Sequence, residues 1–292
     1  MKEIVVISGK GGTGKTSITA SFAVLGGEEV VVADCDVDAA DMHLLLDPDF
    51  SNPEPFFSGE LAVIDQDLCI ACNKCFEVCR YDAVRIEDGR YSIDEISCEG
   101  CGYCARVCPD EAITNVEQNV GNWYRSGIRT GSKMVHARLK IGADNSGKLV
   151  AKVKNEARKT ATEMGKEIIL VDGSPGIGCP VVSSLSGASF VVLVTESTMS
   201  GLHDLQRVYE LVKKFGIKAG CIINKADLNE DVLRELHSFL DREEIAKLGE
   251  IPYDEAFTEA ITNGSTIVEW DSSIKERLEK CWATIKQLTG VS

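Results

Sequence analysis

Short apolar runs alternate with amphipathic stretches along most of the chain. The runs with the character of strands cover residues 3–8, 29–34, 167–172, 189–195, 217–223 and about 247–251. Between them, apolar residues recur at helical spacing, as in the stretch from Ile18 to Leu25. Because alternating strands and helices are typical of a parallel sheet covered on both faces, we predict an α/β fold with a mainly parallel sheet flanked by helices.

The last predicted helix is amphipathic. Its apolar residues stand at helical spacing: Ile274, Leu278, Cys281, Trp282, Ile285 and Leu288. Acidic residues lie among them and no polybasic tail follows, which disfavours binding to an anionic membrane. We therefore predict that this helix packs on the core and that the chain has no stable membrane anchor.

The region from about residue 58 to 116 breaks the alternation and is rich in cysteine. It holds two copies of the pattern C-x2-C-x2-C-x3-C: Cys69, Cys72, Cys75 and Cys79, then Cys98, Cys101, Cys104 and Cys108. Each cysteine of the second copy stands 29 residues after its counterpart, and Ile64-Asp65 matches Ile93-Asp94. A strand, a ligand loop and a short helix are thus repeated. This spacing is that of bacterial ferredoxins with two clusters.

The offset fourth cysteine of each copy predicts interleaved ligation. Three closely spaced thiolates can bind three irons of one 4Fe-4S cluster, whereas the fourth points away toward the other cluster. We assign one cluster to Cys69, Cys72, Cys75 and Cys108, and the other to Cys98, Cys101, Cys104 and Cys79. Zinc sites and disulfides are the alternatives, but zinc modules normally use separated C-x2-C pairs. Arg80 stands where the second copy has proline, beside the cluster assigned to Cys79.

Turn-forming residues flank the cysteine region on both sides. Pro53, Pro55, Ser58 and Gly59 precede it, and the polar residues 114–121 follow it. We predict that both segments are short linkers, since such composition is typical of loops. The predicted domains are an inserted α+β ferredoxin domain at 58–116 and a discontinuous nucleotide-binding domain at 1–57 and 117–292.

A glycine-rich loop follows the first predicted strand and precedes a helix. It reads Ser8-Gly-Lys-Gly-Gly-Thr-Gly-Lys-Thr-Ser17, in the strand, loop and helix context that a phosphate-binding loop requires. The residues expected to surround the phosphates are Gly11, Gly12, Thr13, Gly14, Lys15, Thr16 and Ser17. Their backbone N–H groups and the helix N-terminus attract anions. We expect Lys15 to bind the β- and γ-phosphates and Thr16 to hold Mg²⁺.

Acidic residues follow two of the predicted strands. Asp34 and Asp36 come after the second strand, and Asp172 ends a buried strand before the glycine-rich residues 173–178. Since the carboxyl ends of parallel strands face the ligand in such sheets, we expect these carboxylates near the phosphates. Asp172 is then the residue placed near Mg²⁺.

The segment KGGTGKT, residues 10–16, resembles the deviant Walker A motif of the ParA/MinD-like ATPases, a superfamily that includes the nitrogenase iron protein. Taken end to end, the chain is similar to members that carry an inserted ferredoxin domain. The resemblance implies that Lys10 reaches the nucleotide of a partner subunit. It therefore implies a homodimer with ATP at the interface.

The same resemblance implies roles for further residues. Residues 34–41 match switch I, in which Asp36 orients the attacking water, and 173–178 match switch II. Asn224 and Pro252 would lie at the adenine base. The string Asn-Lys-x-Asp that begins at Asn224 also occurs in GTPases, but the loop and switch sequences favour ATP. Relatives often carry asparagine at the position of Asp41, so we interpret this residue, and Asp38, as helix-start caps.

Charge and hydropathy exclude several classes of protein. The net charge of −15 argues against general nucleic-acid binding. No apolar stretch is long enough to span a bilayer and no signal peptide is evident, which predicts a cytoplasmic protein. Cations nevertheless dominate residues 121–154, and this run is either a solvated face or a docking surface for an acidic partner or an anionic metal complex.

Four cysteines lie outside the cysteine repeat, namely Cys35, Cys179, Cys221 and Cys281. Cys221 and Cys281 stand among apolar residues, and we predict that both are buried. Cys179 is interpreted as a packed thiol near the dimer interface, with a ligand of a metal bridging two subunits as the alternative. His136 is predicted to pack within a strand.

Together these features predict an ATPase that also carries iron-sulfur clusters. We expect Mg²⁺-dependent ATP hydrolysis to control electron transfer toward a partner metalloprotein. The alternative is an ATP-dependent factor that assembles or inserts a metal or iron-sulfur cluster. A positioning ATPase on the nucleoid or membrane is disfavoured by the acidity of the chain.

Overall fold

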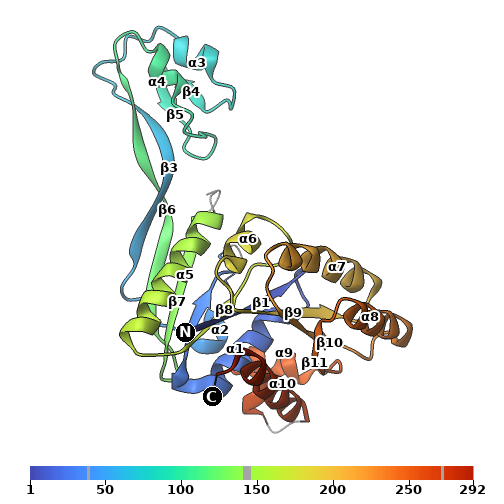
Figure 1. Cartoon of the computed structure of the whole chain (residues 1–292). Coiled ribbons are helices and arrows are strands. Elements are labelled where there is room, and N and C mark those ends of the chain that lie inside the picture. Colours follow the sequence, from blue (N-terminus) through green and yellow to red (C-terminus); the bar gives the residue numbers. More distant parts are fainter. Residues whose placement is uncertain (38–39, 141–145, 271–272, 292) are drawn as a thin grey trace. The chain divides into compact units, whose positions relative to one another are not determined.

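A computed structural model describes residues 1–37, 40–140, 146–270 and 273–291. The chain divides into two compact units. The larger, here the large unit, contains Met1–Glu54, Trp123–Arg138 and Ser146–Ser292, and the smaller, here the cysteine unit, contains Pro55–Asn122 and Leu139–Asn145. Two long neighbouring strands, β3 (Glu54–Ile64) and β6 (Ile113–Gly127), carry the chain between them (Figure 1).

The large unit is built on parallel strands. These are β1 (Lys2–Ser8), β2 (Val30–Asp34), β7 (Lys133–Leu139), β8 (Ile168–Asp172), β9 (Phe190–Glu196), β10 (Ala219–Asn224) and β11 (Ala246–Glu250). The order in the sheet is β11-β10-β9-β1-β8-β2-β7, followed by β6 and β3. Each pair from β11 to β7 is parallel.

Helices cover both faces of this sheet. They are α1 (Lys15–Gly26), α2 (His43–Leu46), α5 (Ser146–Glu163), α6 (Cys179–Leu185), α7 (Met199–Lys214), α8 (Glu230–Arg242), α9 (Ala256–Thr262) and α10 (Ser273–Thr289), with the 3-10 turns η1 (Gly27–Glu29) and η2 (Ile267–Glu269). Figure 1 shows α1, α9 and α10 on one side of the strands, and α5, α6 and α7 on the other. The predicted α/β fold with a flanked, mainly parallel sheet is confirmed.

The core follows from strands that are apolar on both faces. Ile4 and Val6 of β1 pack with Phe22 of α1 and Trp282 of α10, whose rings stack with centroids 5.3 Å apart. Val5, the residue between the two on β1, points to the opposite face and is also fully buried. A continuous apolar run is what such a doubly covered strand requires, which is why these strands were recognisable in the sequence.

The helix α10 is held by the core, as predicted. Its buried residues are Ile274, Leu278, Cys281, Trp282, Ile285 and Thr289. The prediction is wrong for Leu288, whose surface is 47% exposed. No helix in the described ranges has the length and apolar character needed to cross a membrane.

The register of the strands collects polar residues at one edge of the sheet. Asp34 of β2 pairs with Asp172 of β8, and Asn224 of β10 pairs with Glu196 of β9. All four residues end their strands, beside the loop that follows β1. The fold therefore brings side chains from four distant segments to one place.

The cysteine unit repeats one small motif. Besides β3 and β6 it contains α3 (Lys74–Val78), β4 (Val84–Glu87), β5 (Arg90–Ile93) and α4 (Tyr103–Val107). Asn73 and Gly102, which stand before the two helices, both have φ of +68°. Asp65 donates its backbone N–H to Ala112, and Asp94 donates to Ala83, both at 2.7 Å. Because each bond joins one copy to the other at matching positions, the two copies interlock.

The predicted linkers beside the cysteine region are strands instead. Residues 53–59 lie largely within β3, and 114–121 lie within β6. The loop prediction from local composition is wrong here because β3 and β6 are neighbours in the sheet, so each supplies backbone hydrogen-bond partners for the other. Pro55 is compatible with this arrangement, since β3 is the last strand of the sheet and one of its sides needs no donors.

Candidate functional site

The glycine-rich loop after β1 lines a pocket. The pocket has a volume of about 630 Å³ and is lined by Ser8, Gly11, Gly12, Thr13, Gly14, Lys15, Thr16, Ser17, Asp36, Asp41 and Pro175. Every loop residue predicted to surround the phosphates is among these. The loop leads directly into the N-terminus of α1, so the positive end of the helix dipole faces this pocket.

Gly14 is required by the conformation of the loop. Its φ is +88°, and a Cβ on this residue would stand 2.5 Å from Nδ2 of Asn224. That amide group in turn donates to the carbonyl of Thr13 at 2.8 Å. The backbone of the loop and the end of β10 are thus in direct contact.

A Gly14→Ala variant should lose nucleotide affinity by about tenfold or more and fold with about 1–2 kcal/mol less stability, because the left-handed backbone is strained and Asn224 must shift. Titration calorimetry and urea denaturation would measure both effects. The control is Gly127→Ala, whose added Cβ has its nearest neighbour at 3.9 Å. Equal behaviour of the two variants would contradict the prediction.

Lys15 lies among carboxylates below the loop. Its ammonium group is 2.9 Å from Oδ1 of Asp172 and 3.4 Å from Oδ2 of Asp36, with only 6% of the side chain exposed. Burial opposes the charge, yet Asp172 and Asp36 together hold the pKa of Lys15 above its ordinary value. Burial and the nearby Asp172 raise the pKa of Asp34 well above its usual range, which Lys15 counteracts. The site is short of positive charge.

The residues beside Lys15 fit a hydrated Mg²⁺ ion with a phosphate. Thr16 donates its hydroxyl to Oδ2 of Asp172 at 2.9 Å. Among the described residues, Oδ2 of Asp34 and the hydroxyl of Thr13 are buried without a hydrogen-bond partner. Buried polar atoms are normally satisfied, so a bound ion, its water or a phosphate is the expected partner. Oxygen donors of this kind suit Mg²⁺.

The two predicted switch segments are joined by hydrogen bonds. Ser174 of the second segment donates its hydroxyl to the carbonyl of Cys35 in the first, and Cys35 donates its backbone N–H to the backbone carbonyl of Asp172, the residue before the second segment, both at 2.8 Å. The capping role predicted for Asp41 is wrong: α2 starts after Met42 with no side-chain cap, and Asp41 lines the phosphate pocket. Asp38 lies outside the described residues.

A second pocket adjoins the loop. It has a volume of about 760 Å³ and is lined by Gly12, Gly14, Ser17, Asn224, Lys225, Pro252, Tyr253, Asp254, Phe257, Thr258 and Ile261. Asn224 and Pro252, both predicted at the base, thus lie beside the same pocket. Asp227 accepts the backbone N–H of Tyr253 at 2.7 Å, so this carboxylate braces the loop that flanks the pocket.

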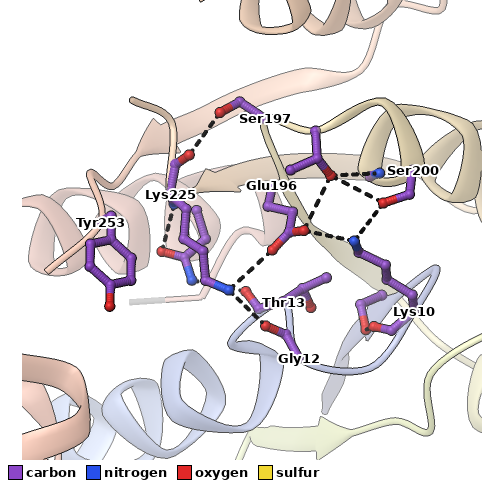
Figure 2. A network of polar contacts seen from close by, with 12 residues as sticks. Lys10, Gly12, Thr13, Glu196, Ser197, Ser200, Lys225 and Tyr253 are labelled. Carbon is purple, nitrogen blue, oxygen red and sulfur yellow. Dashed lines mark hydrogen bonds and ion pairs between the residues drawn. The ribbon is translucent and has the colours of Figure 1, made fainter. Parts of the chain in front are cut away.

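Lys10 is the predicted loop residue that stands apart from the phosphate pocket. Its ammonium group is 2.7 Å from Oε1 of Glu196, at the end of β9. Lys225 contacts the other oxygen of Glu196 at 3.1 Å (Figure 2). Sequence reasoning missed both Glu196 and Lys225. The sequence did contain a signal for Glu196, because this acidic residue ends an apolar, buried strand in the same way as Asp172 does.

Two pockets in the cysteine unit are each lined by four cysteines. The first, of about 350 Å³, has Cys69, Cys72, Cys75 and Cys108 in its wall, and the second, of about 370 Å³, has Cys79, Cys98, Cys101 and Cys104. None of these cysteines forms a disulfide. Among the described residues, no three His, Cys, Asp or Glu side chains are grouped so as to hold a metal ion. Each pocket takes its fourth cysteine from the other copy of the repeat.

The remaining cysteines differ in exposure. Cys221 and Cys281 are buried, as predicted. Cys179 is exposed at the start of α6, so it is not packed within this chain.

The cations of residues 121–154 do not form one free surface. Lys154 is buried and pairs with Glu3 at 3.0 Å. Arg129 pairs with Glu269, and Arg125 pairs with Glu156 and Glu163. These side chains hold parts of the large unit together, which removes most of the support for a basic docking surface.

His136 is packed in β7, as predicted. It is 2% exposed, and its Nε2 lies 2.8 Å from the hydroxyl of Ser126. Burial, with Arg138 nearby, lowers the pKa of His136 from 6.5 to about 4. A histidine whose pKa is lowered in the folded state contributes stability that is fully present above its pKa in the unfolded chain. This stability is lost as the pH falls from that value to the pKa of the histidine in the folded state.

We expect the free energy of unfolding to drop by about 2–3 kcal/mol between pH 6.5 and 4 because of His136. A His136→Asn variant should show a flatter dependence in this window when unfolded with urea. His203→Asn serves as the control, since 69% of that side chain is exposed. Parallel curves for the wild type and His136→Asn would refute the assignment.

Comparisons with known proteins bear on both units. A family model described as the CobQ/CobB/MinD/ParA nucleotide binding domain matches residues 4–267. An uncharacterized protein of Methanocaldococcus jannaschii is 31% identical over 289 residues, which cover 98% of this chain and 96% of that protein. A ferredoxin of Pyrobaculum islandicum is 35% identical over 75 residues, which cover 23% of this chain and 70% of the ferredoxin.

A solved structure shares the fold. The septum site-determining protein MinD complexed with Mg-ADP from Pyrococcus horikoshii superposes with a TM-score of 0.61. The alignment covers 99% of this chain and 97% of that chain at 20% identity.

Proposed function

We propose, on the premise that this chain belongs to the CobQ/CobB/MinD/ParA family of nucleotide-binding domains, that it is an ATPase whose nucleotide state controls two 4Fe-4S clusters. In this proposal ATP binding and Mg²⁺-dependent hydrolysis regulate electron transfer to a partner metalloprotein. The observation that carries the proposal is the presence, in one chain, of the phosphate pocket and of two pockets each lined by four cysteines.

The phosphate pocket supports ATP as the ligand and hydrolysis as the reaction. Lys15 and the loop amides would bind the phosphates, while Thr16 and Asp172 would hold Mg²⁺, which neutralises charge on the phosphates. Asp36 stands at the same pocket, where its carboxylate would orient the attacking water. Asn224 and Pro252 would flank the adenine. Lys10 would reach the nucleotide of a second copy in a homodimer.

The cysteine unit supports the cluster part of the proposal. Each pocket combines three cysteines of one copy with the fourth of the other, which is the set that the interleaved pattern requires. The interlocked backbone bonds between the copies support the same pairing. The similar segment of the Pyrobaculum ferredoxin adds to this support. We therefore propose residues 58–116 as a ferredoxin domain inserted in the nucleotide-binding domain.

The connection between the two parts gives a physical route for coupling. β2 ends at Asp34 and pairs with β7 through Ala33 and Val135. β6, which continues into the cysteine unit, precedes β7 and is its neighbour in the sheet. A change at switch I would therefore act on a strand that is hydrogen-bonded to the segment carrying the clusters. Coupling of this kind requires an element with two states that both sites bias.

The experiment is an anaerobic redox titration with and without a non-hydrolysable ATP analogue, followed by optical and electron paramagnetic resonance spectroscopy. We expect the nucleotide to change the cluster potentials or the rate of transfer to a captured partner. The control is the same titration of a Lys15→Met variant, in which the analogue should have no effect. Identical potentials and rates in both states would refute the coupling.

A second function is favoured by one feature of the pockets. Cys72 and Cys101, one in each pocket, are exposed. Exposed ligands suit an assembly factor that transfers a cluster to an apo-protein. Clusters that stay bound through repeated ATP turnover would favour electron transfer, whereas iron that moves to an apo-acceptor during turnover would favour assembly.

A further inference from the structure

The two lysines of the phosphate loop are bound to different carboxylates. Lys15 pairs with Asp172 and Asp36 inside the phosphate pocket. Lys10 instead lies between Oε1 of Glu196 and the hydroxyl of Ser200, with 2.7 Å to each (Figure 2). Both of these acceptors belong to the same chain as Lys10, so its ammonium group has a carboxylate partner within its own subunit.

Glu196 is shared by two ammonium groups. Its second oxygen lies 3.1 Å from Nζ of Lys225, which also donates to the carbonyl of Gly12 at 3.0 Å. Figure 2 shows Glu196 between the two lysines. Burial opposes ionisation of this side chain, yet the hydrogen bonds from Lys10 and Lys225 lower the pKa of Glu196. At neutral pH it is a carboxylate with two cationic partners.

Rigid elements hold Glu196 in this position. It is the last residue of β9, a strand buried along its whole length. Thr198, the N-cap of α7, donates its hydroxyl to Oε1 of Glu196 at 3.2 Å and accepts the backbone N–H of Gly201 at 3.0 Å. A Cβ on Gly9 would stand 2.3 Å from the carbonyl of Asp204, so the loop packs directly on α7. The acceptor for Lys10 is therefore preorganised.

Lys225 is also fixed in an uncommon conformation. Its φ is +50°, a value that residues other than glycine rarely adopt. Ser197 donates its hydroxyl to the carbonyl of Lys225 at 2.7 Å, and Asn224 accepts the backbone N–H of Lys225 at 3.0 Å. These bonds direct the Lys225 side chain across Gly12 to Glu196. Backbone strain of this kind is retained where the surroundings enforce it.

The geometry points to Glu196 as a positioning residue that holds Lys10 within its own subunit, and to Lys225 as the cation that keeps Glu196 paired when Lys10 leaves. Lys10 must give up the carboxylate before it can bind a phosphate, because its ammonium group cannot span both. An unpaired, largely buried carboxylate is unfavourable. With Lys225 present, the departure of Lys10 leaves one carboxylate with one cation. This inference rests on the proposed contact of Lys10 with the nucleotide of a second copy.

Substitutions on the two sides of this arrangement should act in opposite directions. Glu196→Gln weakens the hold on Lys10, so we expect the dissociation constant of the ATP-dependent dimer to fall by about three- to tenfold. Lys225→Met leaves Lys10 as the sole cation on Glu196, so we expect this constant to rise by a similar factor. Sedimentation in the presence of a non-hydrolysable ATP analogue would measure the dimer dissociation constants of both variants. For each variant, the concentration of the analogue is chosen from the affinity of its monomer, so that all proteins are compared at the same nucleotide saturation.

The matched control is Glu243→Gln. Glu243 pairs with Lys213 at 2.8 Å, and among the described residues no hydrogen bond or ion pair links it to Lys10, Glu196 or Lys225. Its dimer constant should equal that of the wild type. Changes of the same sign in Glu196→Gln and Lys225→Met would overturn the inference, since a merely structural role would weaken the dimer in both variants.

A second readout does not depend on dimer formation. Acylation of lysine amines by acetic anhydride, followed by mass spectrometry of the nucleotide-free protein, reports how strongly each ammonium group is held. Lys10 should react several-fold faster in Glu196→Gln and more slowly in Lys225→Met, while Lys213 stays unchanged in both. Equal reactivity of Lys10 in all three proteins would refute the positioning role. Absence of an ATP-dependent dimer in the wild type, with the expected labelling pattern, would instead refute only the proposed dimer.

Discussion

Replacing Lys15 by methionine should reduce nucleotide affinity by about 100-fold or more. The substitution removes the cation that would bind the phosphates, and hydrogen bonds to charged groups contribute about 1.5–3 kcal/mol each. It also leaves Asp34, Asp36 and Asp172 together without the ammonium group that now lies 2.9 Å from Asp172. Calorimetric titration with Mg-ATP would measure the loss. A Lys213→Met variant, which alters an exposed lysine of α7, should bind like the wild type.

The same variant should show a stability defect that grows with pH. Burial and Asp172 already raise the pKa of Asp34, and removal of Lys15 takes away the charge that opposes this rise. A carboxyl group whose pKa is higher in the folded state destabilises the fold as the pH rises toward that value. Urea denaturation should therefore give a larger difference from the wild type at pH 8 than at pH 5.5. A difference that shrinks over this range would contradict the assignment of these charges.

The interleaved ligand sets predict which pairs of cysteine substitutions act together. The wild type should contain about eight irons per chain, and a Cys108→Ser variant about four. Adding Cys72→Ser to Cys108→Ser should cost no further iron, since both residues line the first pocket. Adding Cys101→Ser should remove the remaining iron, since Cys101 lines the second pocket. Iron analysis of anaerobically purified protein would measure each content.

Sequential ligation makes the opposite prediction. If each run of four cysteines bound its own cluster, Cys108→Ser and Cys101→Ser would affect one cluster, and Cys72→Ser would affect the other. Cys179→Ser is the control, because Cys179 lies outside both pockets and is exposed at the start of α6. Unchanged iron in Cys179→Ser would also exclude a cluster bridging two subunits through this residue. Circular dichroism would check that the variants remain folded.

Much of the nucleotide pocket was predictable because its parts are local in sequence. Gly11, Gly12 and Gly14, with the helix that follows, define a loop of backbone amides that does not depend on the rest of the chain. The acids at the ends of β2 and β8 could be placed at the same edge because parallel strands share a direction. The capping role predicted for Asp41 is wrong because it does not follow from local sequence. The start of α2 has no side-chain cap and is fixed by packing instead.

The sequence by itself determined six of the parallel strands, the helices α1 and α10, the phosphate loop and the cysteine repeat, since each depends on hydrophobic period, glycine or fixed spacing within a short segment. Only the tertiary structure decided that residues 54–64 and 113–127 are strands, because distant backbone pairing overrides their polar composition. It alone decided that Lys10 pairs with Glu196, a residue 186 positions away. The partner of a long, flexible side chain is set by strand register and helix packing, which no local pattern specifies.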